Sequence, residues 1–291
     1  MATHRLRRTV AIALIAGVVM SAPSHADDLA AFANHAEASS SRVDHRALEQ
    51  YLDAFAVANS GRTQIAYSVA DGRGHAFLEQ YITLLGRMDP TTVNRNEQLA
   101  YWLNLRNAMV IDLVSEAKSP RRLGGEIGTA QNPGAAWVEP RVSVSGQALS
   151  IQDVEAILFR NWNNPNLIYG LYQGTKDGAR LPRAPFSGET VNETLEELGR
   201  DFVGTSTMGR VRRGTLELAP VYERYGDAAF GGDQAAMLSH VQALASGRFA
   251  KKLDGISEVS FRKSKHRGEV FTPRAARAPI NSGGGGFSGG S

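Results

Sequence analysis

The longest apolar run of the chain contains two asparagines and an aspartate. Residues 96–114 read NEQLAYWLNLRNAMVIDLV, and at about 100° per residue their apolar side chains cover nearly the whole circumference of a helix. A helix that is apolar all round is a buried one. The pattern therefore predicts a central buried helix over about 96–116, and Asn94 with Glu97 predicts a capping box at its start.

Two asparagines, Asn104 and Asn107, lie three positions apart and share one face of this predicted helix. A buried amide without a partner costs about 1–3 kcal/mol, so both side chains must be hydrogen-bonded. One interpretation is that they clamp an irregular loop, such as residues 118–136, against the core. The other is that they bind a ligand, in a pocket that Tyr101 and Glu155 would also line.

Shorter elements are predicted on both sides of the central helix. Hydrophobic periodicity predicts further helices at residues 42–57, 75–87, 151–162, 191–203 and 234–245. Capping residues support their starts, namely Ser41, Ser150, Asp233 and the pair Thr190 and Glu193. A hairpin is predicted between residues 138 and 149, and short strands at 167–172 and 216–218. The sequence thus predicts one helix-rich α+β domain with a small, mostly antiparallel sheet.

The first 26 residues have the layout of a signal peptide. Three arginines precede an apolar stretch at residues 10–22, and the small residues Ser24 and Ala26 fit a cleavage site before Asp27. An uncleaved N-terminal anchor is the alternative. We expect the mature protein to be periplasmic or secreted, with no transmembrane span.

Removing this segment changes the charge of the chain. The 32 basic residues lose the three arginines of residues 1–26 and then equal the 29 acidic residues, so the mature chain has no net charge. This balance argues against a nucleic-acid-binding protein. The chain also has no cysteine, so disulfides, thiolate metal ligands and thiol nucleophiles are excluded.

The C-terminal end differs in composition from the rest. Residues 248–277 hold nine Lys or Arg against three acids, and residues 279–291 are rich in glycine and serine. We expect a flexible segment at 27–40, a folded domain at 41–260, and a basic, then glycine-rich disordered tail at 261–291. The tail is either a solvated extension or an electrostatic tether to an acidic surface.

Familiar catalytic and cofactor-binding motifs are missing. The histidines form neither H-x-x-x-H nor H-x-H, so the local sequence predicts no metal site, although ligands remote in sequence could still converge. G-x-S-x-G, a P-loop and G-x-G-x-x-G before a helix are also absent. We therefore predict no cofactor.

Several charged side chains fall within apolar helices. The acids Glu97, Asp112 and Glu155 are candidate functional groups, and the alternative role of each is a cap or an ion pair. Arg106 needs a carboxylate partner or an exit to solvent. Arg160 could pair with Glu155 or Asp153, and either arginine could instead hold an anionic ligand.

Three segments of the chain resemble one known family. They are AYWLNLRNA at 100–108, SIQDVEAILFR at 150–160 and ETLEELGRDFV at 193–203. They are similar to the family called domain of unknown function 547 (DUF 547), whose members carry Tyr-Trp-[Ile/Leu]-Asn-Leu-Tyr-Asn-Ala in a core helix. The resemblance covers about Arg42 to Leu253 and implies that this region shares the family's fold.

The departures from the family pattern bear on chemistry. The family has histidines at the positions of Ala156 and Ile168, and a cysteine at the position of Gln173. A cysteine near a histidine would suit thiol nucleophilic chemistry, which this chain could not perform. Arg106 stands where the family has tyrosine.

These observations predict a non-catalytic binding or scaffolding protein of the cell envelope. The expected partner is an envelope protein or an acidic surface polymer. One alternative is a hydrolase that acts on envelope material through carboxylates. Another is an interaction protein that residues 248–277 tether to an acidic surface.

Overall fold

A computed structural model describes residues 29–59, 62–67, 70, 72–116, 128, 133–175, 178–205 and 207–262. The predicted signal peptide, most of the loop at 118–136 and the glycine-rich tail lie outside these residues. No helix within the described ranges is long and apolar enough to span a membrane.

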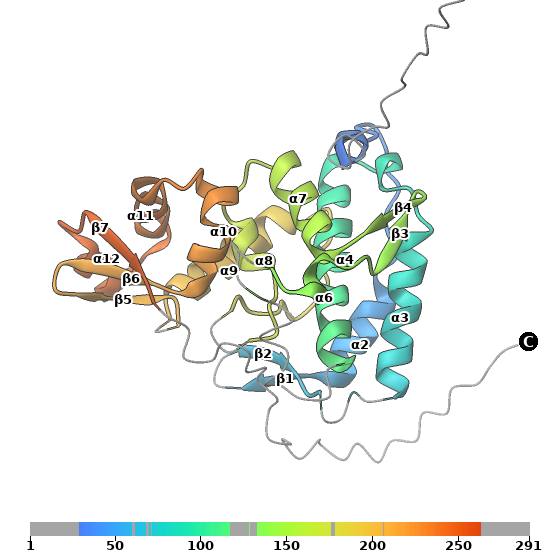
Figure 1. Ribbon diagram of the computed structural model, residues 1–291, viewed down its shortest axis with the longest axis horizontal. Helices are drawn as coiled ribbons and strands as arrows, with labels where there is room; N and C mark the ends of the chain where they lie inside the picture. The colour runs from blue at the N-terminus through green and yellow to red at the C-terminus, as the bar shows by residue number, and fades with distance from the viewer. Residues whose placement is uncertain are drawn as a thin grey trace, which may run out of the picture.

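The central helix α4 (Arg95–Glu116) organises the fold, and every residue from Glu97 to Val114 is buried. The prediction of a buried helix over about 96–116 is therefore confirmed. Four helices pack around it directly or through a neighbour: α2 (Arg46–Phe55), α3 (Arg73–Gly86), α7 (Ile151–Asn161) and α9 (Val191–Val203). Figure 1 shows α4 between α3 and α7.

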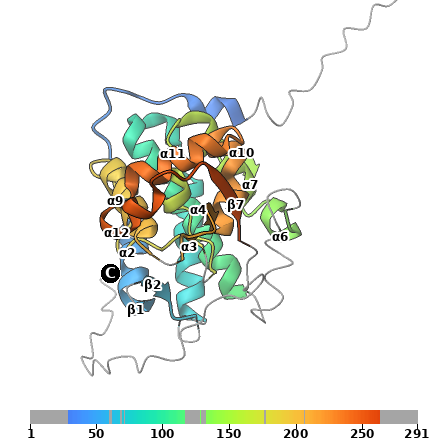
Figure 2. The same cartoon turned by 90° about the vertical axis from the view of Figure 1, so that its left-hand side faces the viewer.

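The C-terminal helices form the other end of the molecule. They are α10 (Pro220–Phe230), α11 (Gln234–Leu244) and α12 (Gly247–Leu253). The view turned by 90° shows α10 and α11 at the end that faces the viewer (Figure 2). Four short helical turns also occur in the part of the chain that the structure describes: η1 (Ala31–Ala33), η2 (Pro90–Thr92), α6 (Ala135–Val138) and α8 (Leu167–Gly170).

The strands of the described residues form three small sheets. The antiparallel pairs are β1 (Ala56–Asn59) with β2 (Arg62–Ile65), β3 (Val142–Val144) with β4 (Gln147–Leu149), and β5 (Gly209–Arg212) with β6 (Thr215–Leu218). Strand β7 (Glu258–Phe261) adds to β6 in parallel. The helix-rich α+β class with mostly antiparallel pairing is confirmed.

The predicted hairpin is confirmed, and its turn explains the sequence. Ser145 and Gly146 both have positive φ, 50° and 82°. A two-residue turn with positive φ at both positions matches the twist of antiparallel strands, and glycine adopts it without strain. The hairpin lies against α3, and it brings Arg141 beside the C-terminal half of α4.

Capping predictions are confirmed in part. Ser150 and Asp153 form a complete capping box at the start of α7, and Asp233 caps α11 by accepting from Ala235 N–H. The first long helix begins at Arg46, so the predicted cap at Ser41 is wrong. The reason is that the carboxylate of Glu97 takes the N–H of Val43 at 2.7 Å and holds the chain there outside the helix.

The strand predicted at 167–172 is also wrong, because residues 167–170 form the helical turn α8. The Asn166 N–H donates to Asn164 Oδ1 at 2.9 Å, and this turn leads directly into α8. A short apolar run fits a buried strand or a buried helical turn equally well, so periodicity alone does not separate them.

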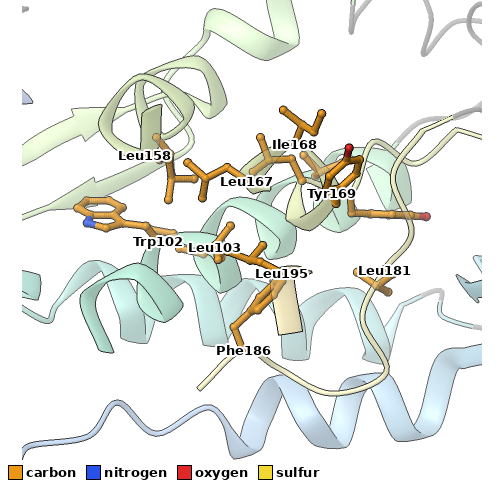
Figure 3. Close-up of a cluster of buried hydrophobic side chains, with 14 of the residues drawn as sticks. Trp102, Leu103, Leu158, Leu167, Ile168, Tyr169, Leu181, Phe186 and Leu195 are labelled. Atoms are coloured by element: carbon orange, nitrogen blue, oxygen red, sulfur yellow. The ribbon is translucent and has the colours of Figure 1, made fainter. Parts of the chain in front are cut away.

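The core joins α4 to the elements on either side of it. Trp102 and Leu103 of α4 lie near Leu158 of α7, the α8 side chains and Leu195 of α9 (Figure 3). Phe32, from the segment predicted to be flexible, is buried with its ring centroid 5.0 Å from that of Trp102. The chain around η1 is thereby anchored to α4.

Candidate functional site

The two central asparagines hold a backbone segment against α4. Asn104 donates to Phe186 C=O at 2.8 Å and accepts from Phe186 N–H at 2.9 Å. Asn107 donates to Gly170 C=O at 2.8 Å and accepts from Tyr172 N–H at 3.0 Å. The backbone they hold is therefore that of Gly170, Tyr172 and Phe186, and not the loop at 118–136 that the sequence suggested.

Little space remains beside these amides. A cavity lined by Asn104 and Asn107 has a volume of about 10 Å³, which is about enough for one water molecule. Tyr101 points elsewhere, since its hydroxyl donates to Leu85 C=O on α3 at 2.9 Å. Of the four residues predicted to form one pocket, Asn104 and Asn107 line this cavity, whereas Tyr101 and Glu155 do not.

Arg106 and Glu155 form a buried ion pair beside Asn107. Arg106 is fully buried, and its Nη2 lies 2.7 Å from Glu155 Oε1. The same carboxylate accepts from Tyr225 OH at 2.8 Å and from Trp137 Nε1 at 3.1 Å. The predicted carboxylate partner of Arg106 is thus Glu155, and both oxygens of that carboxylate are occupied by donors.

The remaining sequence candidates lie apart from this ion pair. Glu97 is buried, and it accepts from the N–H groups of Val43 at 2.7 Å and Gly188 at 3.1 Å. It therefore ties two loops to the start of α4. Arg160 is exposed at the end of α7, and Glu155 pairs with Arg106 in its place.

Asp112 lines an open cavity near the other end of α4. This cavity has a volume of about 330 Å³, and its charged lining residues are Glu79, Asp112, Glu116 and Arg141. Arg141 Nη2 donates to Asp112 Oδ2 at 3.0 Å and to Glu116 Oε2 at 2.6 Å. Three carboxylates thus face one guanidinium, which leaves the cavity negatively charged.

His75 of α3 completes this cluster. Its Nδ1 lies 3.1 Å from Asp112 Oδ1, and its Nε2 lies 3.5 Å from Glu79 Oε1. Ligand atoms of His75, Asp112 and Glu116 all lie within 4.8 Å of one another. We refer to these three residues together with Glu79 and Arg141 as the Asp112 cluster.

Burial and hydrogen bonding shift the pKa of two members of this cluster, Asp112 and Arg141. Desolvation raises the pKa of the Asp112 carboxyl, and the hydrogen bond from Arg141 offsets that effect only in part. Burial lowers the pKa of Arg141, but the hydrogen bonds to Glu116 and Asp112 more than reverse this and raise it. A cation that entered the cavity would stabilise the charged form of Asp112.

Sequence reasoning identified Asp112 and missed the rest of its cluster. Asp112 and Glu116 are four residues apart and so share one helix face, which is the signal that could have found them. His75 and Arg141 come from α3 and from the start of the hairpin, and only the fold brings them to α4.

The positions where the family has cysteine and histidine carry unreactive side chains in this protein. Ile168 is fully buried, Gln173 is 8% exposed, and Ala156 faces solvent on α7. A cavity beside Gly174 measures about 10 Å³. These side chains supply neither a nucleophile nor a base.

Two partly buried histidines, His45 and His240, predict how the free energy of unfolding depends on pH. Burial lowers the pKa of His45 and of His240 to about 4. Both are more readily protonated in the unfolded chain, so their contribution to stability is complete above about pH 6.5 and is lost as the pH falls toward 4. Asp112 acts in the opposite direction, because protonation relieves the cost of burying its charge.

Urea unfolding between pH 7 and pH 4.5 measures this effect. We expect the free energy of unfolding to fall across that range, and the fall to be smaller in His45→Gln. His35→Gln is the control, since His35 lies beside Glu37 and not against the core residue Tyr81. An equal slope in His45→Gln and the wild type would contradict the prediction.

The fold and its charged cavity define a class of protein: a helix-rich α+β domain with a negatively charged pocket beside a buried central helix. Residues 90–203 match the family described as "Protein of unknown function, DUF547". This match confirms the family assignment that the sequence motifs indicated, for the part of the chain from η2 to α9. The chain matches no curated protein and no solved structure.

Proposed function

We propose that this protein is a non-catalytic binding protein that acts after export, in the periplasm or outside the cell, and that the cavity beside Asp112 is its binding site. One observation carries the proposal. The cavity of about 330 Å³ is lined by three acidic side chains and one basic side chain. Its size lies within the range of small-molecule sites, about 300–1,000 Å³.

The charge of the cavity indicates the class of ligand. Glu79, Asp112 and Glu116 outnumber Arg141, and Asp112 is only 6% exposed. Bringing an anion there would add repulsion, whereas a small cation would pair with carboxylates in a partly dry environment. We therefore propose a small cationic ligand.

The surroundings of the other acids support binding in preference to hydrolysis. Both oxygens of Glu97 accept backbone N–H groups, and both oxygens of Glu155 accept side-chain donors. Neither carboxylate has a free oxygen with which to act on a substrate. The proposal of export rests on residues 1–26, and the tether at 248–277 stays a prediction, since the structure describes only 248–262 of it.

A thermal-shift assay in the presence of EDTA tests the binding site. Spermidine, choline, lysine and arginine are suitable small cations. A ligand present at one hundred times its dissociation constant adds about 2.7 kcal/mol, which raises Tm measurably. We expect such a rise in the wild-type protein and its loss in Asp112→Asn.

The matched control is Asp44→Asn, because Asp44 also pairs with an arginine but lies exposed at the surface. This variant is expected to keep the ligand-dependent rise. A rise that persists unchanged in Asp112→Asn would show that the ligand binds elsewhere.

N-terminal sequencing tests the proposed export. The first residue of the exported protein is expected to be Asp27.

A further inference from the structure

Three potential metal ligands converge from two helices beside the cavity. Asp112 and Glu116 are one helical turn apart on α4, and His75 projects from α3. One ligand atom from each lies within 4.8 Å of the other two. Imidazole nitrogen and carboxylate oxygen are both ligands of divalent transition cations.

The buried atoms at the centre of this cluster lack hydrogen bonds. Among the described residues, neither Asp112 Oδ1 nor His75 Nδ1 has a hydrogen-bond partner, although the two atoms lie only 3.1 Å apart. Buried polar atoms are nearly always hydrogen-bonded, so this pair calls for a physical explanation. Asp112 is only 6% exposed, and its Oδ1 atom has almost no surface from which water could donate a hydrogen bond.

The separation of these two atoms fits a shared cation. Two ligands at about 2.0–2.1 Å from Zn²⁺, at the tetrahedral angle, lie about 3.3 Å apart. The observed 3.1 Å is close to that value. Two lone pairs at this distance repel each other unless a proton or a metal cation lies between them.

The neighbouring side chains orient the ligands. Arg141 binds Asp112 Oδ2 and Glu116 Oε2, which leaves Asp112 Oδ1 beside His75 and the second oxygen of Glu116 outside the bond to Arg141. Glu79 lies 3.5 Å from His75 Nε2, so a proton on Nε2 would face Glu79 and leave the Nδ1 lone pair toward Asp112. A carboxylate behind a histidine ligand and hydrogen bonds to ligand carboxylates are characteristic supports of metal sites.

We propose that His75, Asp112 and Glu116 bind one divalent cation of the zinc type, with water filling the remaining coordination. This inference rests on the proposed function, because it names the cation of the same cavity. It departs from the sequence prediction of no metal site, since the three ligands come from two separate helices. Calcium and magnesium fit less well, because they prefer six or more oxygen ligands and this cluster offers a nitrogen.

Isothermal titration calorimetry with Zn²⁺ tests the proposal. The protein is purified without a polyhistidine tag and treated with EDTA before the titration. We expect one Zn²⁺ per chain, with affinity reduced at least tenfold in His75→Gln and in Asp112→Asn. Glu116→Gln supplies a second test, because the Glu116 side chain is 46% exposed and its replacement leaves the core unchanged. Circular dichroism shows whether each variant keeps the wild-type fold.

The matched control is His35→Gln, which removes a histidine lying 2.9 Å from a carboxylate, Glu37, outside the cluster. It is expected to leave Zn²⁺ affinity unchanged. Zn²⁺ binding of equal strength in all variants, or no binding, would overturn the inference. In either case, stabilisation by an organic cation that depends on Asp112 would leave the proposed function standing, whereas no response to either kind of ligand would overturn both.

Discussion

Replacement of Glu155 by glutamine is expected to destabilise the protein by about 3–5 kcal/mol, because it leaves Arg106 buried without a counter-charge. Arg106 has no exposed surface, and its Nε and Nη2 donate to Glu155 Oε1 at 3.1 and 2.7 Å. Tyr225 OH donates to the same oxygen at 2.8 Å. A neutral amide retains an acceptor for these donors but not the charge.

A double-mutant cycle isolates the charge pair. Arg106→Met leaves a buried carboxylate unpaired and is expected to be as costly as Glu155→Gln. The double variant Arg106→Met/Glu155→Gln removes both charges, so we expect it to be more stable than the sum of the single effects predicts. Urea unfolding followed by circular dichroism gives the four free energies.

The control for this cycle is an ion pair at the surface. Glu196 and Arg200 form an i,i+4 pair with side chains 47% and 57% exposed, so Glu196→Gln is expected to change stability by less than about 0.5 kcal/mol. An equally small effect of Glu155→Gln would contradict the assignment of a buried charge pair. The expected loss of stability also makes Glu155 a poor residue with which to test for catalysis.

The central helix and its need for polar partners could be predicted because both follow from residues that are close together in the sequence. The apolar residues of 96–114 repeat around a full helix, and Arg106 in that run required a carboxylate. The capping residue Ser150 and the turn residues Ser145 and Gly146 are likewise local signals. Each of these predictions depends on residues at most a few positions apart.

The identities of the partners could not be predicted, because they depend on distant segments. Asn107 could be expected to bind backbone, but that the backbone is residues 170–172 follows from how α8 packs on α4. Similarly, His75 and Arg141 meet Asp112 only after α3 and the hairpin have packed. The DUF547 match places residues 90–203 in one family and leaves His75 outside the matched segment.

Asn107→Ala is expected to lower the free energy of unfolding by about 2–5 kcal/mol. The substitution leaves Gly170 C=O and Tyr172 N–H buried without their side-chain partner. A buried polar group that loses its partner costs about 1–3 kcal/mol, and two such groups are affected. Arg106 also loses an acceptor, since its Nη1 lies 3.2 Å from Asn107 Oδ1.

Thermal unfolding and amide hydrogen exchange together distinguish a structural role of Asn107 from a role in binding. If the asparagine braces α8 against α4, then Asn107→Ala lowers Tm, and the Tyr172 amide exchanges faster than in the wild type. Asn192→Ala is the control, because the amide of Asn192 is exposed and bonds only weakly to Asn96 at 3.3 Å. A folded Asn107→Ala protein with normal Tm that no longer responds to small cations would instead place the binding site at the asparagines. The Asp112 cavity would then lose its assigned role, because its lining residues do not include Asn107.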